Sequence, residues 1–319
     1  MPHILIAGKI HQAGVELIRA AQGVTFDLVE EVTLASYAPL LPKADALLLR
    51  TQPLHADLIA ASPNLKIVSR HGVGYDAVDV EALNGRKIPL TIVGDVNSRA
   101  VAEHTLALML SAARRVVAHD HAAKTGHWNM RNQFDALELD GKTLLVCGFG
   151  RIGRRVAELA KAFGMEIHAY DPFVSASALR ETRATPEPDL KAALARVDYV
   201  TLHMPGVKGA ILGAEELAVM KPTAIIINAA RGGLVDEAAL DKALRARKIY
   251  GAAFDVMVLE PPTPDCPLLS NPYFTLSPHM AGLTQECAKR MAISAAQNIL
   301  DFFAGKLDPK LIVNAGAIL

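Results

Sequence analysis

The chain has 319 residues, a length that favours two domains, each large enough to bury a core. Lysine and arginine number 33, as do aspartate and glutamate, so the neutral chain has no general attraction to nucleic acid or anionic lipid, and we expect neither as a partner. No apolar run approaches the roughly 18 residues of a membrane span, and the first residues do not resemble an export signal. The three cysteines lack metal-ligand spacing, so we expect no metal site, no disulfide framework and a cytoplasmic location.

Short apolar runs alternate with helix-like segments along most of the chain, which is typical of strands and crossover helices in a parallel sheet. The predicted strands of a first unit are Ile4–Ala7, Thr25–Val29, Ala46–Leu49, Lys66–Ser69 and Leu90–Val93. Those of a second unit are Thr143–Cys147, Met165–Tyr170, Val197–Leu202, Ala224–Asn228, Tyr250–Phe254 and Phe274–Leu276. The predicted fold class is α/β, with two doubly wound parallel sheets of the Rossmann type.

Two long helices complete the prediction. A stretch without proline or glycine, from Asn97 to about Asp120, carries apolar residues at helical spacing and is expected to link the units. The stretch Thr284–Phe303 follows the last predicted strand, and because no strand comes after it we place this helix back on the first unit. The first domain then comprises residues 1–98 and 287–319, and the second comprises residues 99–286. The cleft between them is the expected ligand site.

A glycine-rich turn opens the second unit. After a predicted strand the chain runs Gly148, Phe149, Gly150, Arg151, Ile152, Gly153, and an amphipathic helix follows. In this context a G-x-G-x-x-G run predicts dinucleotide binding. The first glycine permits the tight turn, the second lets the backbone approach a pyrophosphate, and the third lets the helix pack on the strand.

The next predicted strand ends at Asp171, eighteen residues after Gly153. A carboxylate at this place binds the adenosine ribose hydroxyls and repels a 2′-phosphate. We therefore expect the cofactor to be NAD and not NADP. The structural alternative is an aspartate that merely faces solvent at a strand end.

Polar residues follow three predicted strands of the second unit: Arg231, Glu260 and His279. Ligands of doubly wound sheets lie outside the carboxyl ends of the strands, so these side chains are expected to converge. Hydride transfer to a carbon bearing oxygen also needs a proton, which suits histidine, while a carboxylate orients the ring and favours the imidazolium. An arginine binds a carboxylate through its planar fork.

Other histidines compete less well for the proton-transfer role. His104 lies in the linking helix, His168 lies within a strand, and His127 has no activating neighbour in the sequence. His203 follows a strand and stays open as a pocket residue. Taken singly, all three residues also have ordinary structural interpretations: Arg231 as a surface ion-pair partner, Glu260 as a solvated loop acid and His279 as a loop histidine.

Further motifs accompany these residues: Arg70–Asp76, Asn97–Ser98 with Val101–His104, Gly126–Trp128, Ile227–Asp236 and Ala253–Val256. Together with the glycine run, Glu260-Pro261 and Pro278-His279, they resemble the D-isomer-specific 2-hydroxyacid dehydrogenases, with the phosphoglycerate dehydrogenase branch nearest. The resemblance covers almost the whole chain.

This resemblance implies roles for individual residues. Arg231 binds the substrate's carboxylate and keto oxygen, His279 exchanges the proton, and Glu260 pairs with His279. The main chain at Val73 and Gly74 holds the carboxylate, and Asn97 lines the cleft. The implied cofactor contacts beyond the glycine turn and Asp171 are His203, Pro205, Ala229 and Asp255, of which Asp255 faces the nicotinamide carboxamide. The first domain is implied to be flavodoxin-like and to bind substrate.

The same resemblance implies a homodimer formed around the linking helix, with Trp128 reaching towards the neighbouring subunit's site. Two segments depart from the family pattern. Gly94-Asp95 stands where a Pro-Gly pair is usual, and the loop after Pro205 is short and lacks the usual threonine. The chain ends at Leu319, so we expect no C-terminal regulatory domain and no feedback control by an amino acid.

The identity of the 2-hydroxy acid stays open. Arg50 and Arg70 suit a second anionic group and favour 3-phosphoglycerate, although Arg50 also fits a simple surface pair. Hydroxypyruvate and glyoxylate are alternatives, and oxidation of formate or phosphite is a further one. An alternative of another class is an NADH-sensing, corepressor-like binding protein, which the neutral charge and the lack of extended tails disfavour.

Overall fold

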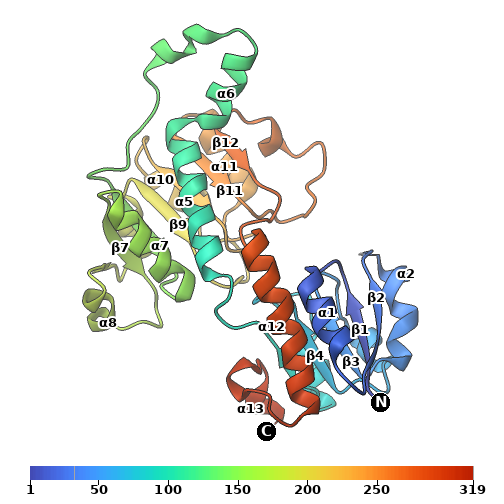
Figure 1. Ribbon diagram of the computed structural model, residues 1–319. Coiled ribbons are helices and arrows are strands. Elements are labelled where there is room, and N and C mark those ends of the chain that lie inside the picture. Colours follow the sequence, from blue (N-terminus) through green and yellow to red (C-terminus); the bar gives the residue numbers. More distant parts are fainter. Residues whose placement is uncertain (32, 319) are drawn as a thin grey trace. The chain divides into compact units, whose positions relative to one another are not determined.

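The computed structural model describes residues 1–31 and 33–318, which fold into two compact units (Figure 1). The first unit comprises residues 1–97 and 283–319, and the second comprises residues 98–282. The sequence analysis places the same two boundaries at 98/99 and 286/287. Each unit has its own parallel sheet, which confirms the predicted fold class.

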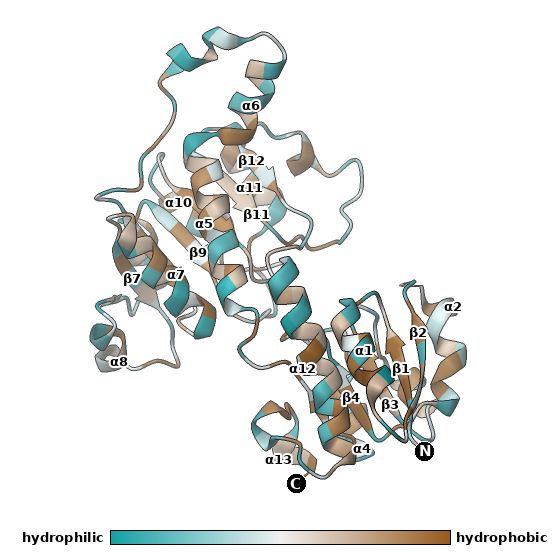
Figure 2. Ribbon diagram, in the orientation of Figure 1, coloured by the Kyte–Doolittle hydropathy of each residue, from teal (hydrophilic) through white to brown (hydrophobic). Residues whose placement is uncertain are grey.

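The sheet of the first unit is built from β1 (His3–Ala7), β2 (Thr25–Val29), β3 (Ala46–Leu49), β4 (Ile67–Arg70) and β5 (Leu90–Thr91). The order is β2-β1-β3-β4-β5, and all pairs are parallel. The helices are α1 (Gln12–Ala20), α2 (Leu34–Tyr37), α3 (Ala56–Ala60), α4 (Val80–Gly85), α12 (Gln285–Phe303) and α13 (Ala315–Ile318), with 3-10 helices η1 (Ala38–Lys43) and η4 (Pro309–Leu311). The central strands are hydrophobic throughout (Figure 2), because helices cover both faces of such a sheet.

Helix α12 belongs to the first unit although it follows the second in sequence. It begins after Thr284, whose hydroxyl caps the Cys287 N–H at 3.1 Å, and it packs along α1 (Figure 1). The two helices approach so closely that a Cβ on Gly14 would lie 2.6 Å from the Ala292 carbonyl oxygen. The hydroxyl of Ser69 on β4 donates to the Ala295 carbonyl at 2.8 Å, which fixes the helix on the sheet.

The sheet of the second unit is built from β6 (Thr143–Cys147), β7 (Glu166–Tyr170), β8 (Thr185–Pro186), β9 (Tyr199–Leu202), β10 (Ile225–Asn228), β11 (Gly251–Phe254) and β12 (Phe274–Leu276). The order is β12-β11-β10-β9-β6-β7-β8. The helices are α5 (Ser98–Arg114), α6 (Val116–Lys124), α7 (Arg151–Ala162), α8 (Ala176–Glu181), α9 (Leu190–Leu194), α10 (Ala214–Val219) and α11 (Glu237–Arg245), with 3-10 helices η2 (Trp128–Gln133) and η3 (Pro267–Ser270). The sequence analysis missed β8, a two-residue edge strand that includes a proline.

The linking helix is interrupted, so the prediction of one continuous helix up to Asp120 was wrong. Helix α5 ends at Arg114, Arg115 adopts a left-handed conformation with φ 49°, and α6 begins at Val116. The Arg115 guanidinium pairs with Asp135, which holds the chain at this break. Helix α6 and η2 form an arm that projects from the rest of the second unit (Figure 1).

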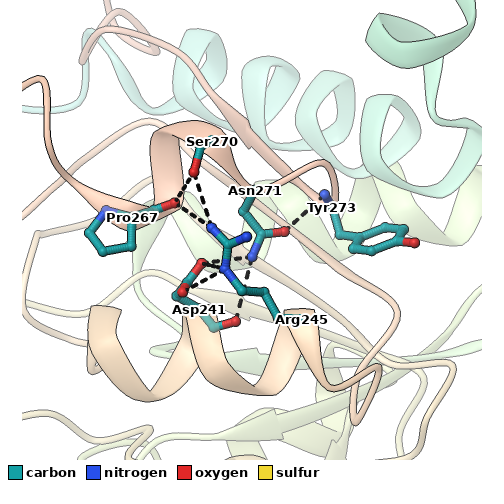
Figure 3. A network of polar contacts seen from close by, with 6 residues as sticks. All are labelled: Asp241, Arg245, Pro267, Ser270, Asn271 and Tyr273. Carbon is teal, nitrogen blue, oxygen red and sulfur yellow. Dashed lines mark hydrogen bonds and ion pairs between the residues drawn. The ribbon is translucent and has the colours of Figure 1, made fainter.

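The loop that joins β11 to β12 carries Glu260, and its far end is anchored to α11 (Figure 3). The Asn271 amide donates to Asp241 at 2.8 Å, and its oxygen accepts from the Tyr273 N–H at 3.1 Å. Arg245 binds Asp241 at 2.9 Å and the Pro267 carbonyl at 3.0 Å. This network fixes the start of β12, the strand that leads to His279.

Candidate active site

In the glycine turn between β6 and α7, two glycines pack against neighbouring backbone and a third faces free space on the side where a cofactor would approach. Gly148 has φ 89°, and a Cβ there would lie 2.6 Å from the His203 carbonyl oxygen. A Cβ on Gly153 would lie 2.1 Å from the Gly148 carbonyl oxygen. A Cβ on Gly150 would meet no atom within 4 Å. The free space therefore lies at the glycine whose backbone a pyrophosphate approaches in this motif.

The same turn supplies hydrogen-bond donors. Gly150 is the N-cap of α7 and has no side chain to satisfy the first N–H groups of the helix. These groups and the helix dipole favour a phosphate at this end. Arg151 is exposed at the first helical position, whereas Ile152 is partly buried against the apolar cluster of Val101, Ala229 and Ala281. The turn thus has the shape and the donors that fit NAD.

Asp171 lies at the end of β7, beside the glycine turn. Its Oδ2 accepts the Phe149 N–H at 2.7 Å, and its Oδ1 accepts the Phe173 N–H at 2.8 Å. The carboxylate is therefore fixed in position by main-chain donors. Each carboxylate oxygen has a second lone pair that suits a ribose hydroxyl.

His203 follows β9, and its main-chain N–H donates to the Cys147 carbonyl at 2.7 Å. Its Nε2 lies 2.9 Å from the Thr201 hydroxyl, and burial lowers its pKa to about 3, so the ring is neutral. A neutral ring of this kind is poorly suited to donate a proton, and it is the main-chain carbonyl of His203 that packs against the glycine turn. Pro205 is exposed on the loop that follows.

Glu260 and His279 meet at the ends of β11 and β12. His279 Nδ1 lies 2.6 Å from Glu260 Oε2, and Glu260 Oε1 accepts the Met257 N–H at 2.9 Å. The His279 side chain is 56% exposed, so its ring is accessible to a ligand. The pair lies in the wall of a cavity of about 330 Å³ that is also lined by Pro261 and Leu276.

The electrostatics of this pair favour the charged form of both groups. The hydrogen bond that His279 donates to Glu260 raises the pKa of His279 and outweighs burial and the nearby charge of Arg231, which lower it. Burial alone would raise the pKa of Glu260, but the hydrogen bonds from His279 and from the Met257 N–H lower it overall. The pair therefore favours an imidazolium that faces the carboxylate through Nδ1, and this arrangement leaves Nε2 for a substrate.

Arg231 lies on a tight turn after β10 that the buried Asn228 side chain holds. The Ala230 N–H donates to the Asn228 amide oxygen at 3.1 Å, and the Asn228 amide donates to the Arg231 carbonyl at 2.8 Å. A Cβ on Gly232 would lie 2.0 Å from the Met257 carbonyl oxygen. Because the Met257 N–H also binds Glu260, one segment supports both the arginine turn and the carboxylate.

Asp255 is 1% exposed and lies beneath this site. Its carboxylate accepts the Ser277 hydroxyl at 2.5 Å, the Met280 N–H at 2.9 Å and the Ala281 N–H at 2.8 Å. Burial alone would raise the pKa of Asp255, but the nearby His104 ring and the hydrogen bonds from Ser277 and these N–H groups lower it. The carboxylate is therefore ionised and firmly held.

Three residues of this site escaped the sequence analysis: His104, Asn228 and Ser277. Asn228 directly precedes the predicted Ala229, and Ser277 lies two positions before His279, so proximity in the sequence is an available signal. The sequence places His104 in the linking helix, away from the strand ends. Its partner Ser277 is 173 positions away, and nothing in the sequence indicates that contact.

The remaining predicted residues belong to the first unit, at the carboxyl ends of its strands. Arg50 follows β3, Val73 and Gly74 follow β4, and Asn97 is the last residue before the second unit. All four are partly exposed. Burial, and then the charges of Arg50 and Arg70, lower the pKa of the intervening His71 to about 4, so this edge is basic through its arginines.

Within the described residues, no group of three or more His, Cys, Asp or Glu side chains is arranged to hold a metal ion. Nor does any helix in that part of the chain have the length and apolar character needed to cross a membrane.

Comparison with known proteins gives consistent matches. Residues 106–281 match the family model described as "D-isomer specific 2-hydroxyacid dehydrogenase, NAD binding domain". The chain is 38% identical to a glyoxylate reductase from Aeropyrum pernix, over 98% of this chain and 96% of that protein. It is 37% identical to a D-3-phosphoglycerate dehydrogenase from Archaeoglobus fulgidus, over 95% of this chain but only 57% of that protein, so it spans little more than half of this relative's length.

Among solved structures, an NADPH-dependent glyoxylate/hydroxypyruvate reductase from Sinorhizobium meliloti is similar, with a TM-score of 0.85 and 30% identity over 95% of each chain. The second unit is thus an NAD-binding domain, as its glycine turn predicts. The full-length match to the Aeropyrum protein extends the relationship to the first unit. The chain belongs to the D-isomer specific 2-hydroxyacid dehydrogenase family.

Proposed function

We propose that the protein is an NAD-dependent dehydrogenase that interconverts a small D-2-hydroxy acid and its 2-oxo acid. The observation that carries the proposal is the His279–Glu260 pair, which forms a 2.6 Å contact. Arg231 lies close enough for its charge to lower the pKa of His279. All three residues lie at the carboxyl edge of the sheet that also carries the glycine turn. The reaction requires a proton donor, a carboxylate that pairs with it and a guanidinium that binds the substrate anion, and His279, Glu260 and Arg231 supply these groups.

In this mechanism the glycine turn and Asp171 would hold NAD, whose nicotinamide would supply or accept the hydride. Arg231 binds the substrate carboxylate and polarises the 2-oxo group through two parallel N–H donors. His279 donates the Nε2 proton to the oxygen during reduction and takes it back during oxidation. Glu260 keeps the ring oriented through Nδ1 and stabilises the imidazolium.

We also propose that Arg50, Val73, Gly74 and Asn97 of the first unit contribute to substrate binding. Loop main chain at 73–74 offers N–H groups to a carboxylate, and Arg50 with Arg70 offers charge to a second anionic group. That second group favours 3-phosphoglycerate. Hydroxypyruvate and glyoxylate are the alternatives, since relatives carry the names of both kinds of enzyme.

For the assembled protein we propose a cytoplasmic homodimer that pairs through the α6–η2 arm. Trp128 and Phe134 on this arm are 65% and 90% exposed. The arm also lines a hollow of about 920 Å³ together with Tyr250 and Tyr273. Exposed aromatic side chains beside a large hollow are typical of an interaction surface. The three free cysteines suit a reducing compartment.

A panel of 2-oxo acids, followed through the absorbance of NADH, tests the proposed activity. We expect turnover of at least one small 2-oxo acid and loss of roughly 10² to 10⁴ in rate in His279→Ala. ADP-ribose, which contains the adenosine and pyrophosphate but no nicotinamide, serves as the control and is expected to bind the variant normally. Tight NADH binding without turnover of any acid would contradict the proposal and favour a binding protein.

A further inference from the structure

A second histidine, His104, contacts residues that hold the turn of the proposed catalytic one. His104 projects from α5, and its Nε2 lies 2.8 Å from the Ser277 hydroxyl. The same nitrogen lies 3.4 Å from Asp255 Oδ1, which is long for a direct hydrogen bond. Its side chain is 21% exposed, whereas Asp255 is 1% exposed. His104 therefore reaches Asp255 chiefly through Ser277.

The hydrogen bonds that join His104, Ser277 and Asp255 can be donated in only one consistent order. A serine hydroxyl has a single proton, and the 2.5 Å contact to the ionised Asp255 takes it. The Ser277 oxygen can then only accept from His104, so Nε2 of His104 carries a hydrogen. The order of donation is His104 to Ser277 to Asp255.

Asp255 in turn holds the turn that carries His279. His279 adopts a left-handed conformation with φ 50°, which a non-glycine residue adopts only when its surroundings hold it. Its N–H donates to the Asp255 carbonyl at 2.8 Å. The next two N–H groups, of Met280 and Ala281, donate to the Asp255 carboxylate. The position of the His279 ring thus depends on where this carboxylate lies.

We propose that His104 is a positioning residue for the dehydrogenase reaction, acting through Ser277 and Asp255 on the turn that carries His279. This inference rests on the proposed function of His279. Without the donor at His104, the Ser277 hydroxyl has another acceptor nearby, the Phe254 carbonyl at 3.4 Å. A hydroxyl that rotates to this carbonyl releases Asp255, and the His279 turn loses one of its fixed points.

The test is a double-mutant cycle with His279. We expect His104→Leu to lower kcat for 2-oxo acid reduction roughly tenfold, because small displacements of a reacting group cost this much or more. We expect the same substitution to have no effect on the residual rate of His279→Ala, since there is no ring left to position. Affinity for ADP-ribose, measured by calorimetry, is expected to stay unchanged in all variants.

Three further variants sharpen the result. His104→Gln places an amide N–H near Ser277 and is expected to retain most of the rate. Ser277→Ala removes the intermediate hydroxyl and is expected to reproduce the loss, again only when His279 is present. Glu103→Gln is the matched control, because this neighbour on the same helix is 55% exposed and pairs only with Arg99 of its own helix at 2.9 Å among the described contacts.

Equal losses in the presence and absence of His279 would overturn the proposal, because a general structural defect acts in both backgrounds. So would a His104→Gln variant as slow as His104→Leu. If His104→Leu does not fold, His104→Gln and Ser277→Ala in the two backgrounds decide the question. If His279→Ala itself retains full turnover, the proposed function fails, which is distinguishable from failure of the role of His104.

Discussion

At the residue scale, the charge of Glu260 sets the protonation of His279, and this contact has a signature in the pH dependence. Reduction needs the imidazolium, so its rate falls as pH rises through the raised pKa of His279, whereas oxidation needs the neutral ring and rises there. We expect Glu260→Gln to move both inflections to lower pH, because the amide carries no charge. The measurement is kcat/KM against pH in both directions. An inflection that does not move would remove Glu260 as the partner.

Asp171 provides a second test, of cofactor choice. A 2′-phosphate next to this fixed carboxylate costs on the order of 4 kcal/mol for charges about 4 Å apart at an effective dielectric constant of about 20. We expect a strong preference for NADH and a much weaker one in Asp171→Ala, measured as the ratio of kcat/KM for NADH and NADPH. Asp120→Ala is a control, since Asp120 pairs with Lys124 on the arm. Equal use of NADPH by the unmodified protein would contradict the assignment.

The substitution Arg231→Lys tests whether substrate binding needs the planar guanidinium as well as the positive charge. Lysine keeps the positive charge but lacks the planar fork that binds a carboxylate through two parallel hydrogen bonds. We expect Arg231→Lys to raise KM for the 2-oxo acid and to lower kcat. Unchanged steady-state kinetics on the best acid would return Arg231 to a surface-pair role.

At the element scale, the glycine turn separates packing from binding. A Cβ on Gly153 would lie 2.1 Å from the Gly148 carbonyl oxygen, so we expect Gly153→Ala to lower the free energy of unfolding by about 3 kcal/mol. A Cβ on Gly150 meets nothing within 4 Å, so Gly150→Ala is expected to change stability by less than about 1 kcal/mol. Its methyl group nevertheless occupies the space that a pyrophosphate needs. Denaturation and NADH titration of both variants check the contrast, and the reverse pattern would contradict it.

The elements that the sequence predicts well are those whose signal is local. Fully buried strands such as Ile225–Asn228 begin with continuous apolar runs, and the glycine turn has a fixed spacing between a strand and a helix. The short edge strand β8 and the break at Arg115 escaped prediction because neither carries a local signal. Arg115 is a good helix former, and the contacts that accompany its left-handed conformation, with Asp135 and with the Tyr273 ring, are remote in the sequence.

The same distinction applies to the candidate site. Arg231, Glu260 and His279 each follow a recognisable strand, so parallel-sheet topology alone predicts that they converge. His104 has no such signal, because it reaches the site from the face of a helix. Its role depends on a hydrogen bond across 173 positions, which only the folded chain reveals.

At the scale of the whole molecule, the α6–η2 arm makes a prediction about assembly. Phe134 is 90% exposed on the arm, and burial of such a ring in an interface contributes roughly 1.5–3 kcal/mol. We therefore expect a dimer in solution, and we expect Trp128→Asp with Phe134→Asp to shift it towards monomer. Phe173→Asp is the matched control, because Phe173 is 96% exposed but lies after β7, outside the arm. Sedimentation velocity of the unmodified protein and of the variants distinguishes the cases. A monomeric unmodified protein would exclude the arm as the interface. So would a dimer that the arm substitutions leave intact while Phe173→Asp disrupts it.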